Sequence, residues 1–290
     1  MEEMQMAETA YDRAEIKTTE QLSEIMRDIH QAAKKHNERF DYKILRNVHF
    51  ANKVKNPVTQ EMNEGDSWRV MQIDNLLVTS FGVINVESKY WRGMIFHDLS
   101  EEIFSSSLDD FSAVNLKSRE KDQDTAAALT NRLDRFFLPN LSEENESLTQ
   151  GYTMSLEQEG RGQRSITLHT GISNPATQVE LSSKLLVRYI NSEITMHKQL
   201  ENKNDRIIDF VKPLVYYNYY DRYDRTNSLV VGNKTKLNAH DAYNCTAVAN
   251  YDDLATFIES FRQAKRVRFS RKTLEKMIGT LKFAEDYGSF

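Results

Sequence analysis

Three charged residues lie within a largely apolar stretch of the sequence. Twelve residues separate Asp74 from Glu87, and Lys89 follows two positions later. Side chains alternate between the two faces of a strand, so Glu87 and Lys89 share one face. Two carboxylates can bind a hard divalent cation, and a neighbouring ammonium group can orient water or offset charge on a phosphoryl oxygen. The chemistry that these residues predict is metal-dependent hydrolysis of a phosphodiester.

The strands that carry these residues are predicted to form a hairpin. Residues 70–80 and 83–91 are rich in β-branched and aromatic side chains, and a Phe-Gly pair separates them. With the turn at that pair, Asp74 lies opposite Lys89 and Glu87 lies on the diagonal beside it. Two carboxylates on an apolar strand pair are unfavourable unless a cation or the lysine neutralises them. The hairpin therefore predicts a cation site.

The same residues carry a family resemblance. An aspartate followed by Glu-x-Lys on a hairpin is similar to the signature of PD-(D/E)XK nucleases. More narrowly, residues 72–74 (QID) and 86–93 (VESKYWRG) resemble the nuclease-related domain family, and residues 174–178 (NPATQ) match its Asn-Pro-x-x-Gln element. The resemblance extends, with gaps, from about residue 15 to 262. It implies an α/β fold with a restriction-endonuclease-like core, in which helices flank a central mixed β-sheet.

The resemblance also implies roles for individual residues. Asp74 and Glu87 would hold a Mg²⁺ or Mn²⁺ ion, and Lys89 would act in catalysis. Gln178 would face the site from the helix that it opens, and Gln72 would support the site. The implied substrate is nucleic acid, DNA rather than RNA, and both endonuclease and exonuclease action fit.

A glutamate on the first helix usually completes the site in this family, and three glutamates compete for that place. The apolar spacing predicts an amphipathic helix over residues 18–36, with Thr18 as its capping residue. Helical phase favours Glu15 if the helix extends that far back, whereas distance to the following strand favours Glu24. Glu20 is the third candidate, and the sequence leaves the choice open.

The remaining patterns describe one domain over residues 1–290. Residues 97–170 are acidic and serine-rich and are too long for an ordinary connection, so we interpret them as an insertion that offers a surface for a protein partner or a second copy of the chain. Residues 265–290 are predicted to form a C-terminal helical extension. Other predicted elements are a helix after Pro175, strands at 207–217, 228–232 and 243–249, and helices near 251–264 and 271–284.

A basic cluster near the C-terminus is the candidate for contact with nucleic-acid phosphates. Its members include Arg262, Lys265, Arg266 and Arg268. Each phosphate that such a side chain neutralises adds salt-dependent affinity. The alternative interpretation is a solvated helix face.

Composition narrows the class of protein. The formal charge of −5 means that any binding of nucleic acid depends on a local basic face rather than on the net charge. A single cysteine and the lack of a secretory or membrane-spanning pattern predict a cytoplasmic protein without a membrane partner. The sequence has no Walker-type loop, dinucleotide fingerprint or Ser/Cys nucleophile arrangement. The main alternative to a nuclease is a nuclease-like fold without activity that binds nucleic acid or protein.

Overall fold

The computed structural model describes residues 10–53, 68–91, 94–99, 152–159, 163–170, 173–197, 208–218, 228–231, 245–264, 269–281 and 285–287. The chain divides into two compact units. The first contains residues 1–91, 178–225 and 236–290, and the second contains residues 92–177 and 226–235. Each unit contains its own β-sheet.

The sheet of the first unit has six strands in the order β10-β1-β2-β3-β7-β9. β10, β1, β2 and β3 are antiparallel to their neighbours, whereas β3, β7 and β9 run parallel, so the sheet is mixed. The strands are β1 (Tyr42–Lys53), β2 (Trp68–Thr79), β3 (Gly82–Lys89), β7 (Lys212–Tyr217), β9 (Thr246–Val248) and β10 (Glu285–Tyr287).

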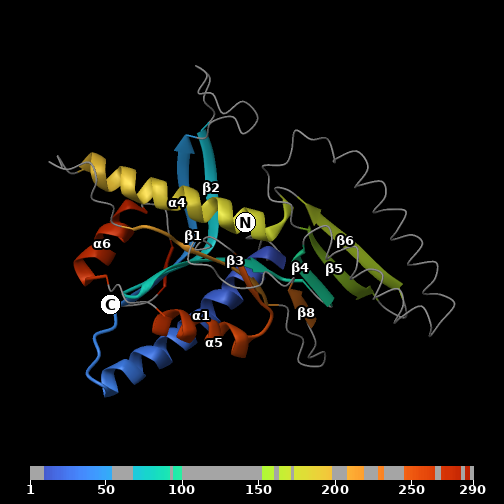
Figure 1. Ribbon diagram of the computed structural model, residues 1–290, viewed down its shortest axis with the longest axis horizontal. Coiled ribbons are helices and arrows are strands. Elements are labelled where there is room, and N and C mark those ends of the chain that lie inside the picture. Colours follow the sequence, from blue (N-terminus) through green and yellow to red (C-terminus); the bar gives the residue numbers. More distant parts are fainter. Residues whose placement is uncertain are drawn as a thin grey trace, which may run out of the picture. The chain divides into compact units, whose positions relative to one another are not determined.

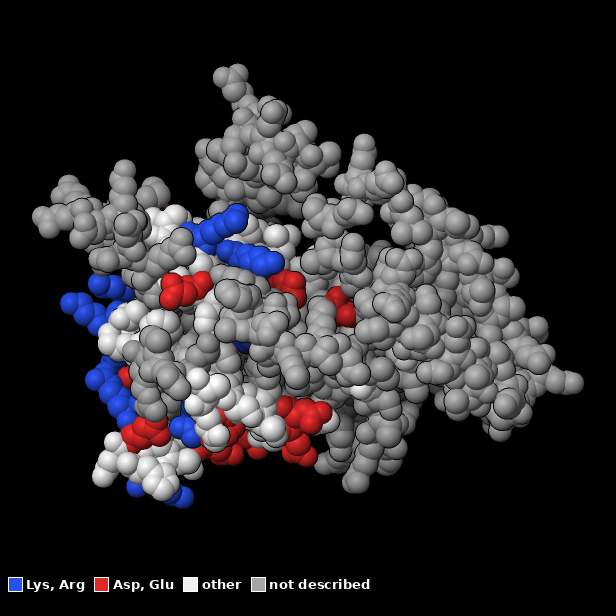
Figure 2. Space-filling view, in the orientation of Figure 1, with Lys and Arg blue, Asp and Glu red and all other residues white. Residues whose placement is uncertain are grey.

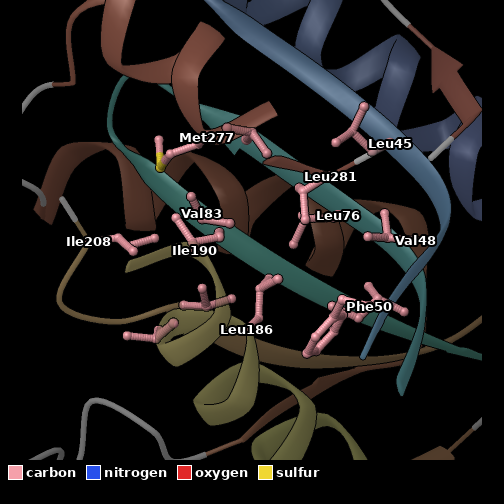
Figure 3. Packing of buried hydrophobic residues seen from close by; sticks show 14 of the residues in the cluster. Leu45, Val48, Phe50, Leu76, Val83, Leu186, Ile190, Ile208, Met277 and Leu281 are labelled. Atoms are coloured by element: carbon pink, nitrogen blue, oxygen red, sulfur yellow. The ribbon is translucent and has the colours of Figure 1, made fainter. Parts of the chain in front are cut away.

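Helices cover both faces of this sheet. On one face, α1 (Ala10–Lys35) and α5 (Tyr251–Ala264) share an apolar cluster with the strands. On the other face, the cluster of Figure 3 joins the sheet to α4 (Pro175–His197) and α6 (Arg271–Thr280). In Figure 1, α4 (yellow) crosses the ribbon formed by β1 and β2. The predicted α/β architecture, a central mixed sheet flanked by helices, is confirmed.

The first helix begins earlier than the sequence predicts. α1 starts at Ala10, and Thr18 lies fully buried within it rather than at its N-terminus. The cap predicted at Thr18 is therefore wrong. Its hydroxyl bonds to other buried side chains, so Thr18 interrupts the apolar stripe of α1 without ending the helix. None of the helices that the structure describes is long and apolar enough to cross a membrane.

The turn between β2 and β3 also differs from the prediction. Its two residues are Ser80 and Phe81, and Gly82 already pairs with Thr79 as the first residue of β3. The Thr79 hydroxyl donates to the Gly82 carbonyl oxygen over 2.8 Å. The Phe81 ring is buried and stacks on Phe40, with ring centroids 5.7 Å apart. Burial of this ring explains why the turn includes Phe81 and leaves Gly82 in the strand.

This turn shifts the register of the hairpin by two residues. The last regular pair is Asn75 with Val86. The next position places Asp74 level with Glu87, and not with Lys89 as predicted from the sequence. Because the shift is an even number of residues, every side chain stays on its expected face.

Both strands of the β1–β2 ribbon change phase at one position. Residues that face α4 and α6 normally follow each other at intervals of two along a strand. The interval is three from Leu45 to Val48 in β1 and from Ile73 to Leu76 in β2. Asn47, with φ of 53°, has a left-handed backbone there and lies opposite Asp74 in the register. Asparagine tolerates this conformation better than most residues. The phase change takes Asp74 out of the apolar pattern.

The second unit contains a four-stranded sheet in the order β6-β5-β4-β8. β4 (Met94–Leu99) and β6 (Gln163–Thr170) are antiparallel to β5 (Tyr152–Glu159), and β8 (Ser228–Val231) is parallel to β4. This unit contains the stretch interpreted as an insertion, of which residues 100–151 and 160–162 lie outside the described part of the chain.

The C-terminal stretch 265–290 is not wholly helical, as the sequence predicts. After α6, strand β10 pairs with β1, with Tyr287 opposite Ile44. A three-residue segment with the sequence EDY has little strand signal of its own, so the pairing with β1 decides its conformation.

Candidate active site

The site begins where β2 and β3 separate. Beyond the pair of Asn75 and Val86, the main-chain N–H of Ser88 donates to Oδ2 of Asp74 over 2.8 Å. A carboxylate thus replaces the main-chain acceptor that a regular ladder would supply. The side chain of Asp74 is held between the strands, beside the residues that the Glu-x-Lys motif contributes.

The electrostatic environment of Asp74 disfavours its charge. Burial raises the pKa of this carboxyl well above its usual range, and the charge of Glu87 raises it further. The charge of Glu15 acts in the same direction, whereas the Ser88 N–H and the charge of Lys89 lower the pKa. Carboxylates grouped in this way attract a proton or a cation. Asp74 and Glu87 therefore lie close enough for their charges to interact, although the register differs from the one predicted.

Lys89 forms an ion pair with its neighbour on the same strand face. Its Nζ lies 2.5 Å from Oε1 of Glu87, and each side chain is only 13% exposed. If the register is continued beyond Asn75 and Val86, Glu87 rather than Lys89 falls opposite Asp74, and Lys89 pairs with Glu87 on its own strand. In the structure the lysine neutralises one of the two expected metal ligands.

The three glutamates of the first helix differ in their relation to Asp74. Glu15 is partly buried, and its charge acts on Asp74. Glu20 and Glu24 are exposed, and the charge of Glu24 acts instead on Tyr251 of α5. α1 begins at Ala10 and so includes Glu15, as the argument from helical phase requires, and the part of Glu15 in completing the site stays a prediction.

A model of the nuclease-related domain matches residues 20–145 of the chain. Over this range the chain is similar to the nuclease-related domain family. The matched range includes Asp74, Glu87 and Lys89, and placement in the PD-(D/E)XK superfamily is consistent with it. Glu15 and the element at 174–178 lie outside that range. No curated protein and no solved structure gives a significant match to the chain.

Gln72, which lies within the matched range, contacts the main-chain irregularity opposite the site. Its Nε2 donates to Oδ1 of Asn47 over 3.1 Å, and the side chain is exposed. Asn47 is the left-handed residue that lies opposite Asp74. Gln72 is thus placed to support the conformation of β1 beside the acids, and its supporting role stays a prediction.

Gln178 lies in the first turn of α4 and is partly buried. Nδ2 of Asn85 donates to the carbonyl oxygen of the next residue, Val179, over 3.3 Å. Asn85 precedes Glu87 by two residues on the same strand face. The start of α4 therefore packs on the strand that carries the motif, and a direct part for Gln178 in the chemistry stays a prediction.

Within the second unit, Asn174 of the Asn-Pro-x-x-Gln element caps α4. Its Oδ1 accepts from the main-chain N–H of Ala176 over 3.1 Å and from the Thr153 hydroxyl over 2.8 Å. Its Nδ2 donates to Oδ1 of Asp98 over 3.1 Å. Pro175 occupies the first helical position, which needs no N–H donor. The first two residues of the element therefore begin the helix.

The predicted phosphate contacts receive little support from the part of the chain that is described. Arg262 is bound by two carboxylates: its Nη2 and Nε contact Glu259 over 2.6 and 2.9 Å, and its Nη1 contacts Glu38 over 3.2 Å. These partners already neutralise the guanidinium group. Lys265, Arg266 and Arg268 lie outside the described residues.

The donor set fits a hard divalent cation that keeps several waters. In the described ranges, no three His, Cys, Asp or Glu side chains form a ready-made metal cluster. Asp74 and Glu87 nevertheless supply two carboxylates whose charges interact, and Mg²⁺ commonly takes only one or two carboxylates from a protein. Ser88 could not be recognised as part of the site from the sequence, because it contributes a main-chain N–H, which every residue type except proline has.

Proposed function

We propose that this protein is a metal-dependent nuclease that hydrolyses phosphodiester bonds, in DNA rather than RNA. The observation that carries the proposal is the meeting of Asp74, Glu87 and Lys89 where β2 and β3 separate in a nuclease-related domain. Asp74 and Glu87 would hold a Mg²⁺ or Mn²⁺ ion. The ion, when bound, lowers the pKa of a water molecule and stabilises charge on the phosphoryl oxygens.

The residues of the chain would divide the remaining work. The Ser88 N–H keeps the Asp74 carboxylate oriented towards the site. Lys89, released from Glu87, would orient the attacking water or offset the charge on the phosphate. Glu15 adds a further negative charge from α1, which strengthens the attraction for a cation.

The test compares cleavage of plasmid, linear and single-stranded DNA, and of RNA, with and without Mg²⁺ or Mn²⁺. Glu87→Gln and Lys89→Met each keep the approximate shape of the side chain but remove its charge. We expect each to lower cleavage by on the order of 100-fold or more, the loss typical of groups that stabilise charge in the transition state. Gel assays on substrates in excess measure the rates.

Matched controls remove the same charges elsewhere on the chain. Glu20→Gln and Lys34→Met change exposed side chains of α1, and we expect cleavage at the wild-type rate. Melting temperatures identify any variant that fails to fold. Cleavage that persists at the wild-type rate in both site variants would remove the assignment.

The second candidate is a nuclease-like fold that binds nucleic acid or protein without cleaving it. The ion pair between Glu87 and Lys89 favours it, since a lasting pair withholds one carboxylate from a cation. Calorimetric titration with Mn²⁺ discriminates between the two functions. A competent site binds the ion and loses the binding in Asp74→Asn, whereas an inert fold gives no heat in either protein.

A further inference from the structure

Five buried polar side chains lie directly behind the acids. They are Thr18 and Thr19 of α1, Asn75 of β2, Ser88 of β3, and Asn218, the residue after β7, and each is at most 4% exposed. We call them the buried polar network. Because buried polar groups lose their hydration, such a network requires a reason beyond the filling of space.

One half of the buried polar network holds the main chain of Glu15 against β2. The Thr19 hydroxyl lies 2.8 Å from the carbonyl oxygen of Glu15 and 2.6 Å from Oδ1 of Asn75, and its single hydrogen serves one of them at a time. Nδ2 of Asn75 lies 3.4 Å from the same carbonyl oxygen and 3.3 Å from the Ser88 hydroxyl. Asn75 is the residue next to Asp74, so this contact sets how α1 approaches the acids.

The other half ties the same part of α1 to β3 and β7. The Ser88 hydroxyl donates to that of Thr18 over 3.0 Å. Nδ2 of Asn218 lies 2.6 Å from both the Thr18 hydroxyl and the carbonyl oxygen of Ala14. The main-chain N–H of Asn218 donates to the carbonyl oxygen of Lys89 over 3.1 Å. The turns of α1 that flank Glu15 are thus fixed to the strand that carries the Glu-x-Lys motif.

The position of the network points to the site rather than to stability alone. Further along α1, the buried face is apolar, with Leu22, Ile25 and Met26 packed on the sheet. Polar side chains take over only where the helix passes the acids. The carbonyl oxygen of the Asn218 side chain is buried without a hydrogen-bond partner in the described structure, which is unfavourable for a purely structural link.

We propose that the buried polar network positions the carboxylate of Glu15 relative to Asp74 and Glu87, and that it thereby sets the affinity of the site for a divalent cation. The inference rests on the proposed metal-dependent function. Thr19, Asn75, Ser88, Thr18 and Asn218 are positioning residues, because they act through the groups that they hold. The central residue of Glu87-Ser88-Lys89 contributes in two ways: its N–H orients Asp74, and its hydroxyl joins the network.

A double-mutant cycle on Mn²⁺ affinity tests the inference in the full chain. Thr19→Val replaces the hydroxyl with a methyl group of similar size, and Thr19→Ser keeps the hydroxyl. We expect Thr19→Val to weaken Mn²⁺ binding by about 10-fold, in the range for residues that orient metal ligands. Thr19→Ser should restore most of the affinity. Calorimetric titration of each protein with Mn²⁺ measures the constants.

The cycle also shows whether the effect passes through Glu15. In a Glu15→Gln background, Thr19→Val should weaken Mn²⁺ binding no further, because the group that it positions has already lost its charge. Ser88→Ala, which removes a single hydroxyl, serves the same cycle if Thr19→Val is too unstable to purify. Its effect should likewise disappear in Glu15→Gln.

A structural control lies away from the acids. Nδ2 of Asn191 in α4 donates to the carbonyl oxygen of Ile208 over 2.8 Å, so Asn191→Ala should lower the melting temperature without changing Mn²⁺ affinity. Equal affinity in wild type and Thr19→Val, or losses that add to those of Glu15→Gln, would overturn the inference and leave the proposed function intact. A wild-type chain that binds no Mn²⁺ would overturn both.

Discussion

Lys89 and Ser88 stabilise the charges of the two strand acids in different ways. The ammonium group of Lys89 pairs with Glu87, and Asp74 receives the main-chain N–H of Ser88. Burial and the charges of Glu87 and Glu15 raise the pKa of Asp74, so its ionised form is unfavourable in the folded chain without a cation. A site of this kind lowers the stability of the metal-free protein, because the arrangement of acids that attracts a cation is unfavourable until the cation binds.

We expect Asp74→Asn to stabilise the folded chain in the absence of metal. Because the folded-state pKa of Asp74 lies above its unfolded value, the folded chain retains a proton that the unfolded chain has lost. This contribution to stability is complete below about pH 4 and is lost as the pH rises through the raised pKa. At pH 7 the variant should therefore be more stable than wild type by about 0.5–2 kcal/mol.

Urea unfolding in EDTA at a series of pH values measures this difference. The gain in the free energy of unfolding should shrink as the pH falls towards 4, where Asp74 of the wild type is also uncharged. Asp28→Asn, at an exposed position of α1, is the control and should show no comparable gain. A variant less stable than wild type at pH 7 would contradict the electrostatic account.

At the scale of elements, the hairpin depends on one glycine. Gly82 has φ of 151°, a backbone conformation that side chains rarely adopt. A Cβ atom there would lie 2.9 Å from Cε1 of Phe261, the ring that packs against Phe81 across the turn. The absence of a side chain at Gly82 therefore permits both the backbone conformation beside the turn and the close packing of α5 on the sheet.

We expect Gly82→Ala to lower the free energy of unfolding by about 1–3 kcal/mol, through backbone strain and overpacking. Thermal and urea denaturation measure the loss. Gly279→Ala is the matched control, since a Cβ atom at that helical position meets nothing within 4 Å. It should be neutral or slightly stabilising. Equal stability of Gly82→Ala and wild type would show that the turn relaxes without cost.

The sequence predicted the elements better than their ends. Residue type and spacing were enough for the hairpin, for the shared face of Glu87 and Lys89, and for strands β7 to β9. The predicted turn was wrong because a tertiary contact, the burial of Phe81, determines which residues form the turn. The predicted start of the first helix was wrong because Thr18 is a good capping residue by type, whereas in the structure its hydroxyl bonds to residues that are distant in the sequence.

The site could be predicted only as far as its charges. Asp74, Glu87 and Lys89 stand out by type, and helical phase favoured Glu15 before its position was known. The buried polar network could not be found, because Thr, Asn and Ser are common on surfaces and nothing in their spacing marks them as buried. Only the packing of α1 on the sheet brings these side chains together.

For the whole molecule, charge is unevenly distributed. Figure 2 shows acidic side chains gathered over α1 and α5, whereas Lys and Arg gather along one edge and over α4. Exposed acids on these two helices include Glu24, Asp28, Asp252 and Asp253, and α4 exposes Lys184 and Arg188. A chain with a formal charge of −5 can therefore still present a basic surface, as nucleic-acid binding would require.

Cation binding should stabilise the whole first unit, because the site draws on α1, β2 and β3. An ion that binds only the folded state adds about 2.7 kcal/mol to the free energy of unfolding at 100 times its dissociation constant. Urea unfolding with and without Mn²⁺ measures this gain. Asp74→Asn should show none of it, and an equal gain in that variant would place the ion elsewhere.

The left-handed backbone of Asn47 also bears on solubility. Within the described part of the chain, strand β10 pairs with β1 from Ile44 to Arg46, and Asn47 is the next residue of β1. An incoming strand from another molecule needs a straight, evenly spaced row of N–H and C=O groups, and the irregularity at Asn47 breaks that row. The residue opposite Asp74 therefore also makes the long ribbon a poor template for aggregation.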